Sequence, residues 1–198
     1  MRKIFLIGDS IRYGTSGNEG YKNGYGYYVK QKLVDKAIVY QPDENCRFLQ
    51  YTLRYLHEWA RKLGIGENID VVHWNNGLWD VLRLFDDEPL TSLEMYKIML
   101  ERVYKRIKNL FPNAKIIFAL TTPVIEEMMD VDFYRKNIEI EQYNQAAIEV
   151  LQPLGVIIND LYRVGMEIKN NYSLDAVHFN EIGSEILAEN VSNIVMEI

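Results

Sequence analysis

Three residues in this sequence have the types and spacing of a group that could perform nucleophilic chemistry. Ser10 comes three residues after the apolar run Ile4–Ile7, and His178 comes three residues after Asp175. A serine hydroxyl is a poor nucleophile at neutral pH unless a nearby base takes its proton. We predict that His178 is this base and that Asp175, one turn before it, holds the Nδ1 proton of the imidazole. A serine that only caps the next helix is the simpler alternative for Ser10.

The search for a base is short because the chain has 3 histidines. His57 lies inside an amphipathic helical pattern and is expected to be an ordinary surface residue. His73 lies inside an apolar run, where we expect a core imidazole. His178 is the remaining candidate.

Acyl transfer also needs hydrogen-bond donors aimed at the developing oxyanion. The backbone N–H of Ser10 is one candidate, and a backbone N–H from the segment Glu44–Phe48 is a second. Asn75 and Asn76 follow another apolar run and offer side-chain amides at the same sheet edge.

Short apolar runs separated by amphipathic patterns indicate the elements that must position these residues. Helices are predicted over 45–64, from the capping-box spacing of Thr91–Glu94 to Pro112, over 138–151, and from Asn180 to the C-terminus. Alternating strands and helices predict an α/β fold, a three-layer α/β/α sandwich with a parallel sheet, as one domain over residues 1–198. The predicted strands are Ile4–Ile7, Ala37–Tyr40, Ile69–Trp74, Lys115–Leu120 and Val156–Ile158.

Two segments do not fit this alternation. Arg12–Gly26 mixes glycines with tyrosines directly after Ser10, and Met128–Lys136 follows the end of a predicted strand. Each is either a surface loop or a wall of the cleft at the strand ends. We assign Tyr13, Asp9 and Asn76 to substrate binding.

Composition excludes several classes of partner. The net charge of −6 argues against a nucleic-acid or anionic-membrane surface, and no run reaches the length of a membrane span. The first residues lack a signal-peptide pattern, so we expect a cytoplasmic protein. The single cysteine excludes an internal disulfide and a cysteine-based metal cluster. The oligomeric state stays open.

With these residues the sequence resembles the SGNH (GDSL-type) hydrolase family of esterases and acyl hydrolases. Gly8-Asp9-Ser10 matches the first block of that family, and Asp175-Ala-Val-His178 matches its last block. The resemblance covers residues 4 to about 190 and implies a flavodoxin-like five-stranded parallel sheet, no metal and no cofactor. It implies Ser10 as nucleophile, with Asp175 and His178 completing a triad.

The middle blocks depart from the family pattern. The third block is commonly Gly-x-Asn-Asp, and here Trp79 stands where the oxyanion-binding Asn is expected. We therefore predict Asn75 as the side-chain donor, with Asn76 in reserve. The second block normally offers a glycine N–H, and we predict the backbone N–H of Cys46 in that role.

The resulting hypothesis is a serine esterase that hydrolyses small esters through an acyl-enzyme intermediate. A small-molecule ester or acylated carbohydrate is the expected partner, with an O-acetyl group on a carbohydrate favoured. Lysophospholipid or thioester hydrolysis would use the same residues. A non-catalytic carbohydrate-binding or scaffold protein is the rival that Trp79 favours. A nucleotide binder is disfavoured because no Gly-x-Gly-x-x-Gly loop follows the first strand.

Overall fold

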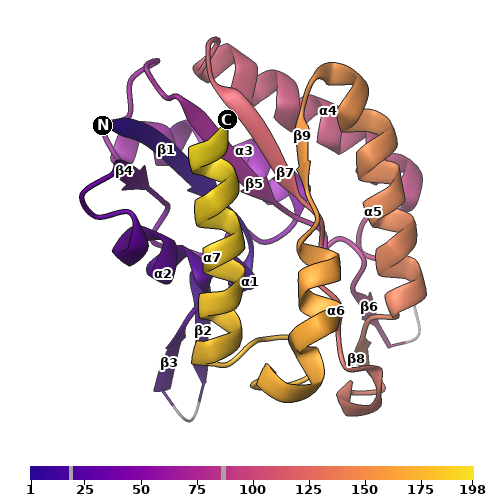
Figure 1. Ribbon diagram of the computed structural model, residues 1–198. Coiled ribbons are helices and arrows are strands. Elements are labelled where there is room, and N and C mark those ends of the chain that lie inside the picture. Colours follow the sequence, from indigo (N-terminus) through magenta and orange to yellow (C-terminus); the bar gives the residue numbers. More distant parts are fainter. Residues whose placement is uncertain (18–19, 86–87) are drawn as a thin grey trace.

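Five parallel strands form the central sheet of the computed structural model, which describes residues 1–17, 20–85 and 88–198 (Figure 1). Their order across the sheet is β4-β1-β5-β7-β9, and each neighbouring pair is parallel. In chain order this is 2-1-3-4-5, the flavodoxin-like arrangement. The predicted α/β class and five-stranded parallel sheet are therefore confirmed. The strands are β1 (Arg2–Ile7), β4 (Ala37–Tyr40), β5 (Val71–Asn75), β7 (Lys115–Ala119) and β9 (Ile157–Asn159).

Six helices cover the two faces of this sheet (Figure 1). On one face, α7 (Glu181–Glu197) packs between α2 (Tyr25–Lys32) and α6 (Leu161–Tyr172). On the other face, α4 (Leu93–Leu110) packs between α3 (Leu49–Lys62) and α5 (Asn137–Leu151). The core lies between these layers. Its centre is formed by the neighbouring strands β1 and β5, and the side chains of Ile4–Ile7 in β1 are fully buried.

The helix boundaries differ from prediction at two N-termini. Helix α3 begins at Leu49 and not at Asn45, because Arg47 adopts a left-handed conformation that a helix cannot include. Helix α4 is capped by Ser92, whose hydroxyl accepts a hydrogen bond from the Met95 N–H, and not by Thr91. Thr91 lies one residue before the cap, where its hydroxyl is 3.4 Å from Gln50 Oε1.

Small elements surround the carboxyl edge of the sheet. Strand β1 leads into the single turn α1 (Ser10–Tyr13) and the antiparallel hairpin of β2 (Gly14–Gly17) and β3 (Gly20–Asn23). Residues 18–19 and the side chains of residues 15–22, within the predicted segment Arg12–Gly26, lie outside the described residues. A second antiparallel pair joins β6 (Arg83–Leu84) to β8 (Phe133–Tyr134), and single 3₁₀ turns occupy Glu126–Met128 and Gln152–Leu154.

The length and the apolar character of its helices decide whether a helical protein can cross a membrane. Within residues 1–17, 20–85 and 88–198, no helix combines the length and the apolar character needed to span a bilayer.

Two glycines with positive φ provide a matched pair for testing how tightly the strand ends are packed. A Cβ on Gly77, which follows β5 with a φ of 150°, would overlap the hydroxyl of Thr121, whereas a Cβ on Gly64, with a φ of 65°, would meet open space. We predict that Gly77→Ala lowers the free energy of unfolding by about 3 kcal/mol and Gly64→Ala by about 1 kcal/mol. Urea denaturation of both variants measures this difference, and equal losses would contradict the packing described for Gly77.

Candidate active site

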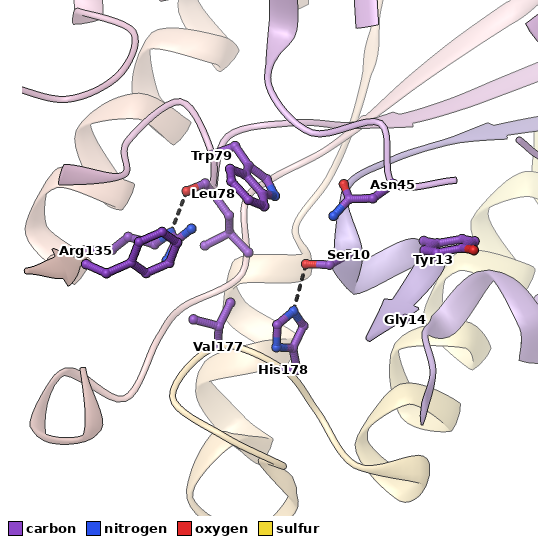
Figure 2. Close-up of a pocket in the computed structure, with 10 residues that line it drawn as sticks. Ser10, Tyr13, Gly14, Asn45, Leu78, Trp79, Arg135, Val177 and His178 are labelled. Atoms are coloured by element: carbon purple, nitrogen blue, oxygen red, sulfur yellow. Dashed lines mark hydrogen bonds between the residues drawn. The ribbon is translucent and has the colours of Figure 1, made fainter. Parts of the chain in front are cut away.

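A cavity of about 310 Å³ opens at the carboxyl edge of the sheet (Figure 2). Its walls come from four parts of the chain: the end of β1 with α1, the loop after β4, the loops around β6 and β8, and the turn before α7. The lining residues are Ser10, Tyr13, Gly14, Asn45, Leu78, Trp79, Phe133, Arg135, Val177 and His178.

Ser10 is held at the mouth of this cavity as the first residue of α1. Asp9 caps that turn: its side chain accepts from the Ile11 N–H at 3.0 Å, and its carbonyl accepts from the Arg12 and Tyr13 N–H groups. The first N–H groups of a helix have no partner within the helix, so the Ser10 N–H is free to point at a ligand. The geometry thus presents both the hydroxyl and the N–H of Ser10.

His178 approaches Ser10 from a part of the chain 168 residues away. Its Nε2 lies 2.8 Å from Ser10 Oγ, as the dashed line in Figure 2 marks. Its Nδ1 lies 2.8 Å from Asp175 Oδ2. An ionised carboxylate only accepts hydrogen bonds, so Nδ1 carries the proton and Nε2 is left to accept from the Ser10 hydroxyl.

The Asp175 carboxylate is fixed by hydrogen bonds from its own turn. Its Oδ1 accepts from the N–H groups of Val177 and His178, each at 2.7 Å. Partial burial alone would raise the pKa of Asp175, but the hydrogen bonds and charge of His178 and the Val177 N–H outweigh burial and lower this pKa to about 2. Asp175 is therefore ionised at neutral pH.

Asn45 faces Ser10 from the loop after β4. Its Oδ1 accepts a hydrogen bond from the Arg47 N–H at 2.8 Å, which fixes the orientation of the side-chain amide. The opposite end of that amide, the Nδ2 donor, consequently points into the cavity toward Ser10 (Figure 2). Nδ2 has no hydrogen-bond partner among the described residues, so it is available to an oxygen held above Ser10.

A buried arginine holds this loop against the end of β1. Arg12 is 1% exposed, and its guanidinium donates to the carbonyls of Pro42 at 2.8 Å, Glu44 at 2.5 Å and Gly8 at 3.3 Å. These bonds join the residues before Asn45 to the residue two positions before Ser10. Arg12 thus holds the loop that carries Asn45 in place beside the end of β1.

The structure contradicts Cys46 as an oxyanion donor and does not place Asn75 in the lining of the cavity. The Cys46 N–H is already donated to the Gly8 carbonyl at 3.0 Å, and Cys46 is fully buried. Asn75 is 1% exposed and does not line the cavity, because it is still part of β5 and its side chain is enclosed there. The predicted segment Glu44–Phe48 does reach the cavity, but through the side chain of Asn45, which the sequence analysis did not single out, and not through Cys46.

Two of the three predicted substrate-binding residues have structural contacts and do not line the cavity. Asp9 is fully buried as the cap of α1. Asn76 is also fully buried: its amide accepts from Trp74 Nε1 at 2.6 Å and from Thr52 Oγ1 at 3.1 Å, and donates to the Arg47 carbonyl. The third, Tyr13, does line the cavity.

Each of the two predicted wall segments contributes two residues to the lining of the cavity. From Met128–Lys136, Phe133 and Arg135 line the cavity, so this segment does form part of the wall. From Arg12–Gly26, Tyr13 and Gly14 line it. Tyr25, in contrast, is fully buried, with its ring centroid 5.9 Å from that of His73.

The other histidines lie away from the cavity. His57 is exposed on α3, as expected. His73 is fully buried in β5, and burial lowers its pKa to about 3, so it is a neutral core residue. In the part of the chain that the structure describes, no three His, Cys, Asp or Glu side chains are grouped so that they could hold a metal ion.

Comparisons with known proteins agree with this arrangement. The model of the GDSL-like lipase/acylhydrolase family matches residues 6–186. No curated protein sequence matches the chain. Similar solved structures include a lipase/acylhydrolase from Enterococcus faecalis, with a TM-score of 0.77, 20% identity and coverage of 98% of this chain and 95% of that one.

Two further solved structures carry more specific names. An acetyl xylan esterase has a TM-score of 0.73 and 18% identity, with 98% of this chain and 99% of that chain covered. A carbohydrate acetylesterase from Sinorhizobium meliloti has a TM-score of 0.71 and 14% identity, with 99% of both chains covered. At these identities the likeness is one of fold.

The buried cap of α1 makes the stability of the protein depend on pH. Burial raises the pKa of Asp9 from 3.8 to about 6, although the Ile11 N–H and the charges of His178, Arg135 and Arg12 oppose this shift. The folded protein therefore binds the Asp9 proton more tightly than the unfolded chain does, and stability falls as pH rises from 4 to above 6.

We predict that Asp9→Asn removes this loss while keeping an oxygen for the Ile11 N–H. Between pH 4 and pH 7, the free energy of unfolding of the wild type should fall by up to about 3 kcal/mol relative to the variant. Urea denaturation of both proteins across this range is the measurement. A difference between them that does not change with pH would contradict the assignment.

Proposed function

The chain belongs to the GDSL-like lipase/acylhydrolase family, and on this premise we propose that it is a serine esterase acting on small esters. The observation that carries the proposal is the contact of Ser10 Oγ with His178 Nε2 at 2.8 Å, with Asp175 bound to the other ring nitrogen. A hydroxyl, a base and an orienting carboxylate in this order are the parts that nucleophilic acyl transfer requires.

The proposed reaction proceeds through an acyl-enzyme. Ser10 Oγ attacks the ester carbonyl carbon as His178 Nε2 takes the hydroxyl proton, and Asp175 stabilises the imidazolium that forms. His178 then gives this proton to the leaving alcohol, which leaves the acyl group on Ser10. A water molecule, deprotonated by His178, attacks the acyl-enzyme and releases the acid.

We assign the oxyanion donors to the Ser10 N–H and to Asn45 Nδ2. Asn45 Nδ2 points toward Ser10 (Figure 2), and neither group has a competing partner among the residues that the structure describes. Asn45 would thereby supply the side-chain donor that the family pattern places at position 79, where this chain has Trp79. This assignment removes the main argument for a non-catalytic scaffold protein.

An O-acetyl group on a carbohydrate is the substrate that we favour. The cavity of about 310 Å³ is at the lower end of the range for ligand pockets, about 300 to 1,000 Å³, which favours a short acyl chain over that of a lysophospholipid. Aromatic side chains at the opening, Tyr13 and Trp79, suit the flat apolar faces of sugar rings. Two of the similar structures are named as an acetyl xylan esterase and a carbohydrate acetylesterase.

Ser10→Ala and His178→Ala test the nucleophile and its base. We predict that either change lowers kcat for p-nitrophenyl acetate by at least about 10³-fold, because each removes a group without which the alcohol is not activated. His57→Ala serves as the matched control, since His57 is exposed on α3, and it should retain the wild-type rate. Wild-type rates for Ser10→Ala would overturn the proposed function.

Asn45→Ser tests the oxyanion donor. The serine hydroxyl can still accept from the Arg47 N–H, so the loop is kept while the amide donor is lost. We predict a fall in kcat of about 10²- to 10³-fold with a KM close to that of the wild type, because the donor acts mainly in the transition state. A raised KM with unchanged kcat would instead assign Asn45 to substrate binding.

A further inference from the structure

Arg135 is the charged side chain of the cavity wall that the proposed reaction does not use. It lies between β8 and α5 and is 4% exposed, yet it lines the same cavity as Ser10 and His178 (Figure 2). Charged side chains are rarely buried to this extent unless they are paired, because their desolvation is costly. The contacts of Arg135 therefore require an explanation.

The hydrogen bonds of Arg135 leave much of its guanidinium unused. Nε donates to the Leu78 carbonyl at 2.5 Å, and this bond fixes the plane of the group beside the cavity. Nη1 is buried and has no partner among the described residues. The ring of Phe133 lies below the cation, 5.3 Å from ring centroid to guanidinium carbon, and fixes its position without using a hydrogen-bond donor.

No carboxylate of the described residues forms an ion pair with Arg135. Asp9 and Asp175 are the acidic groups whose charges act on it, but Asp9 is engaged as the cap of α1 and Asp175 is engaged with His178. Burial lowers the pKa of Arg135 to about 10, with Asp9 and Asp175 opposing this shift, so the guanidinium is charged at neutral pH. In contrast, the neighbouring Arg83 lies 2.7 Å from Glu139.

We propose that Arg135 binds a carboxylate of the substrate, so that the esterase prefers an acidic ester such as an O-acetylated uronic acid. This inference rests on the proposed function and narrows its substrate class. A guanidinium presents donors in a planar fork that matches the two oxygens of a carboxylate. The apolar side chains around it, Leu78, Trp79 and Val177, exclude water from such a pair and strengthen it.

The single guanidinium of Arg135 is a better match for a carboxylate ligand than for a phosphate ligand. A phosphate dianion requires more positive charge and more donors than the one partly used guanidinium on this wall. The carboxylate could belong to the alcohol part of the ester, as in an acetylated uronic acid, or to the acyl part, as in a half-ester of a dicarboxylic acid. Either kind of ester would place a carboxylate in the cavity.

The test compares kcat/KM for matched acidic and neutral esters. The alcohol-side pair is acetylated glucuronic acid and acetylated glucuronamide, and the acyl-side pair is mono-p-nitrophenyl glutarate and its methyl ester. We predict that the wild type prefers the acidic member of one pair by about 10- to 100-fold, the range expected for a charge-assisted hydrogen bond. The pair that shows the preference identifies which part of the substrate carries the carboxylate.

Arg135→Gln should lower this preference by at least about 10-fold, whereas Arg83→Gln should keep it. A purely structural role for Arg135 would lower both rates together and leave their ratio unchanged, which would overturn the proposal. Inhibition of the wild type provides a readout that does not depend on the variant folding. Glucuronic acid should inhibit more strongly than glucuronamide if the alcohol-side pair shows the preference, and glutaramate more strongly than glutaramide if the acyl-side pair shows it.

The outcomes separate this inference from the proposed function. Hydrolysis of the acidic and neutral esters at equal rates in both pairs would overturn the role of Arg135 and leave the esterase intact. Failure to hydrolyse any of the four esters above the rate of Ser10→Ala would overturn the proposed function itself.

Discussion

The candidate site depends on one hydrogen bond, the contact of Ser10 Oγ with His178 Nε2 at 2.8 Å, which joins residues 168 positions apart in the sequence. Such a contact keeps its length only if both sides are fixed before substrate arrives. Ser10 is fixed by a fully buried strand and by the cap that Asp9 forms on α1. His178 is fixed by the turn of Asp175, and the Ala176 carbonyl of that turn accepts from the Ile125 N–H in the loop after β7. Through β1 and the loop after β7, the sheet thus connects Ser10 with His178.

Two buried arginines beside this contact illustrate how the same side chain can serve different purposes. Arg12 donates to three backbone carbonyls and joins the loop of Asn45 to the end of β1. Both of its terminal nitrogens, Nη1 and Nη2, donate within the protein, as expected of a structural residue, although its Nε has no partner among the described residues. Arg135 is buried nearly as deeply but donates to the Leu78 carbonyl alone among the described residues. Because Arg135 lines the cavity and Arg12 does not, the unused donor of Arg135 is better explained by a group that arrives with the substrate.

The sequence predicted the sheet well because the inner strands β1, β5 and β7 are buried on both faces and appear as apolar runs. Helix α6 was missed because Gly165 interrupts its apolar pattern, and the structure explains this glycine: a Cβ there would lie 2.5 Å from the ring of Pro123. The predicted meeting of Ser10, His178 and Asp175 followed from the strand-end position of Ser10, from the choice among 3 histidines and from the family's first and last blocks. The side chain of Asn45 could not be predicted in this way, because its direction depends on the left-handed backbone of Arg47 and on the distant Arg12.

Labelling with a fluorophosphonate followed by peptide mass mapping tests the central claim most directly. This reagent bonds covalently to a serine only when a base activates the hydroxyl and donors stabilise the charge on the phosphoryl oxygen. The account predicts one adduct, on the peptide that contains Ser10, and no adduct when His178 is replaced by alanine. An unlabelled wild-type protein, or an adduct on a different serine, would contradict it.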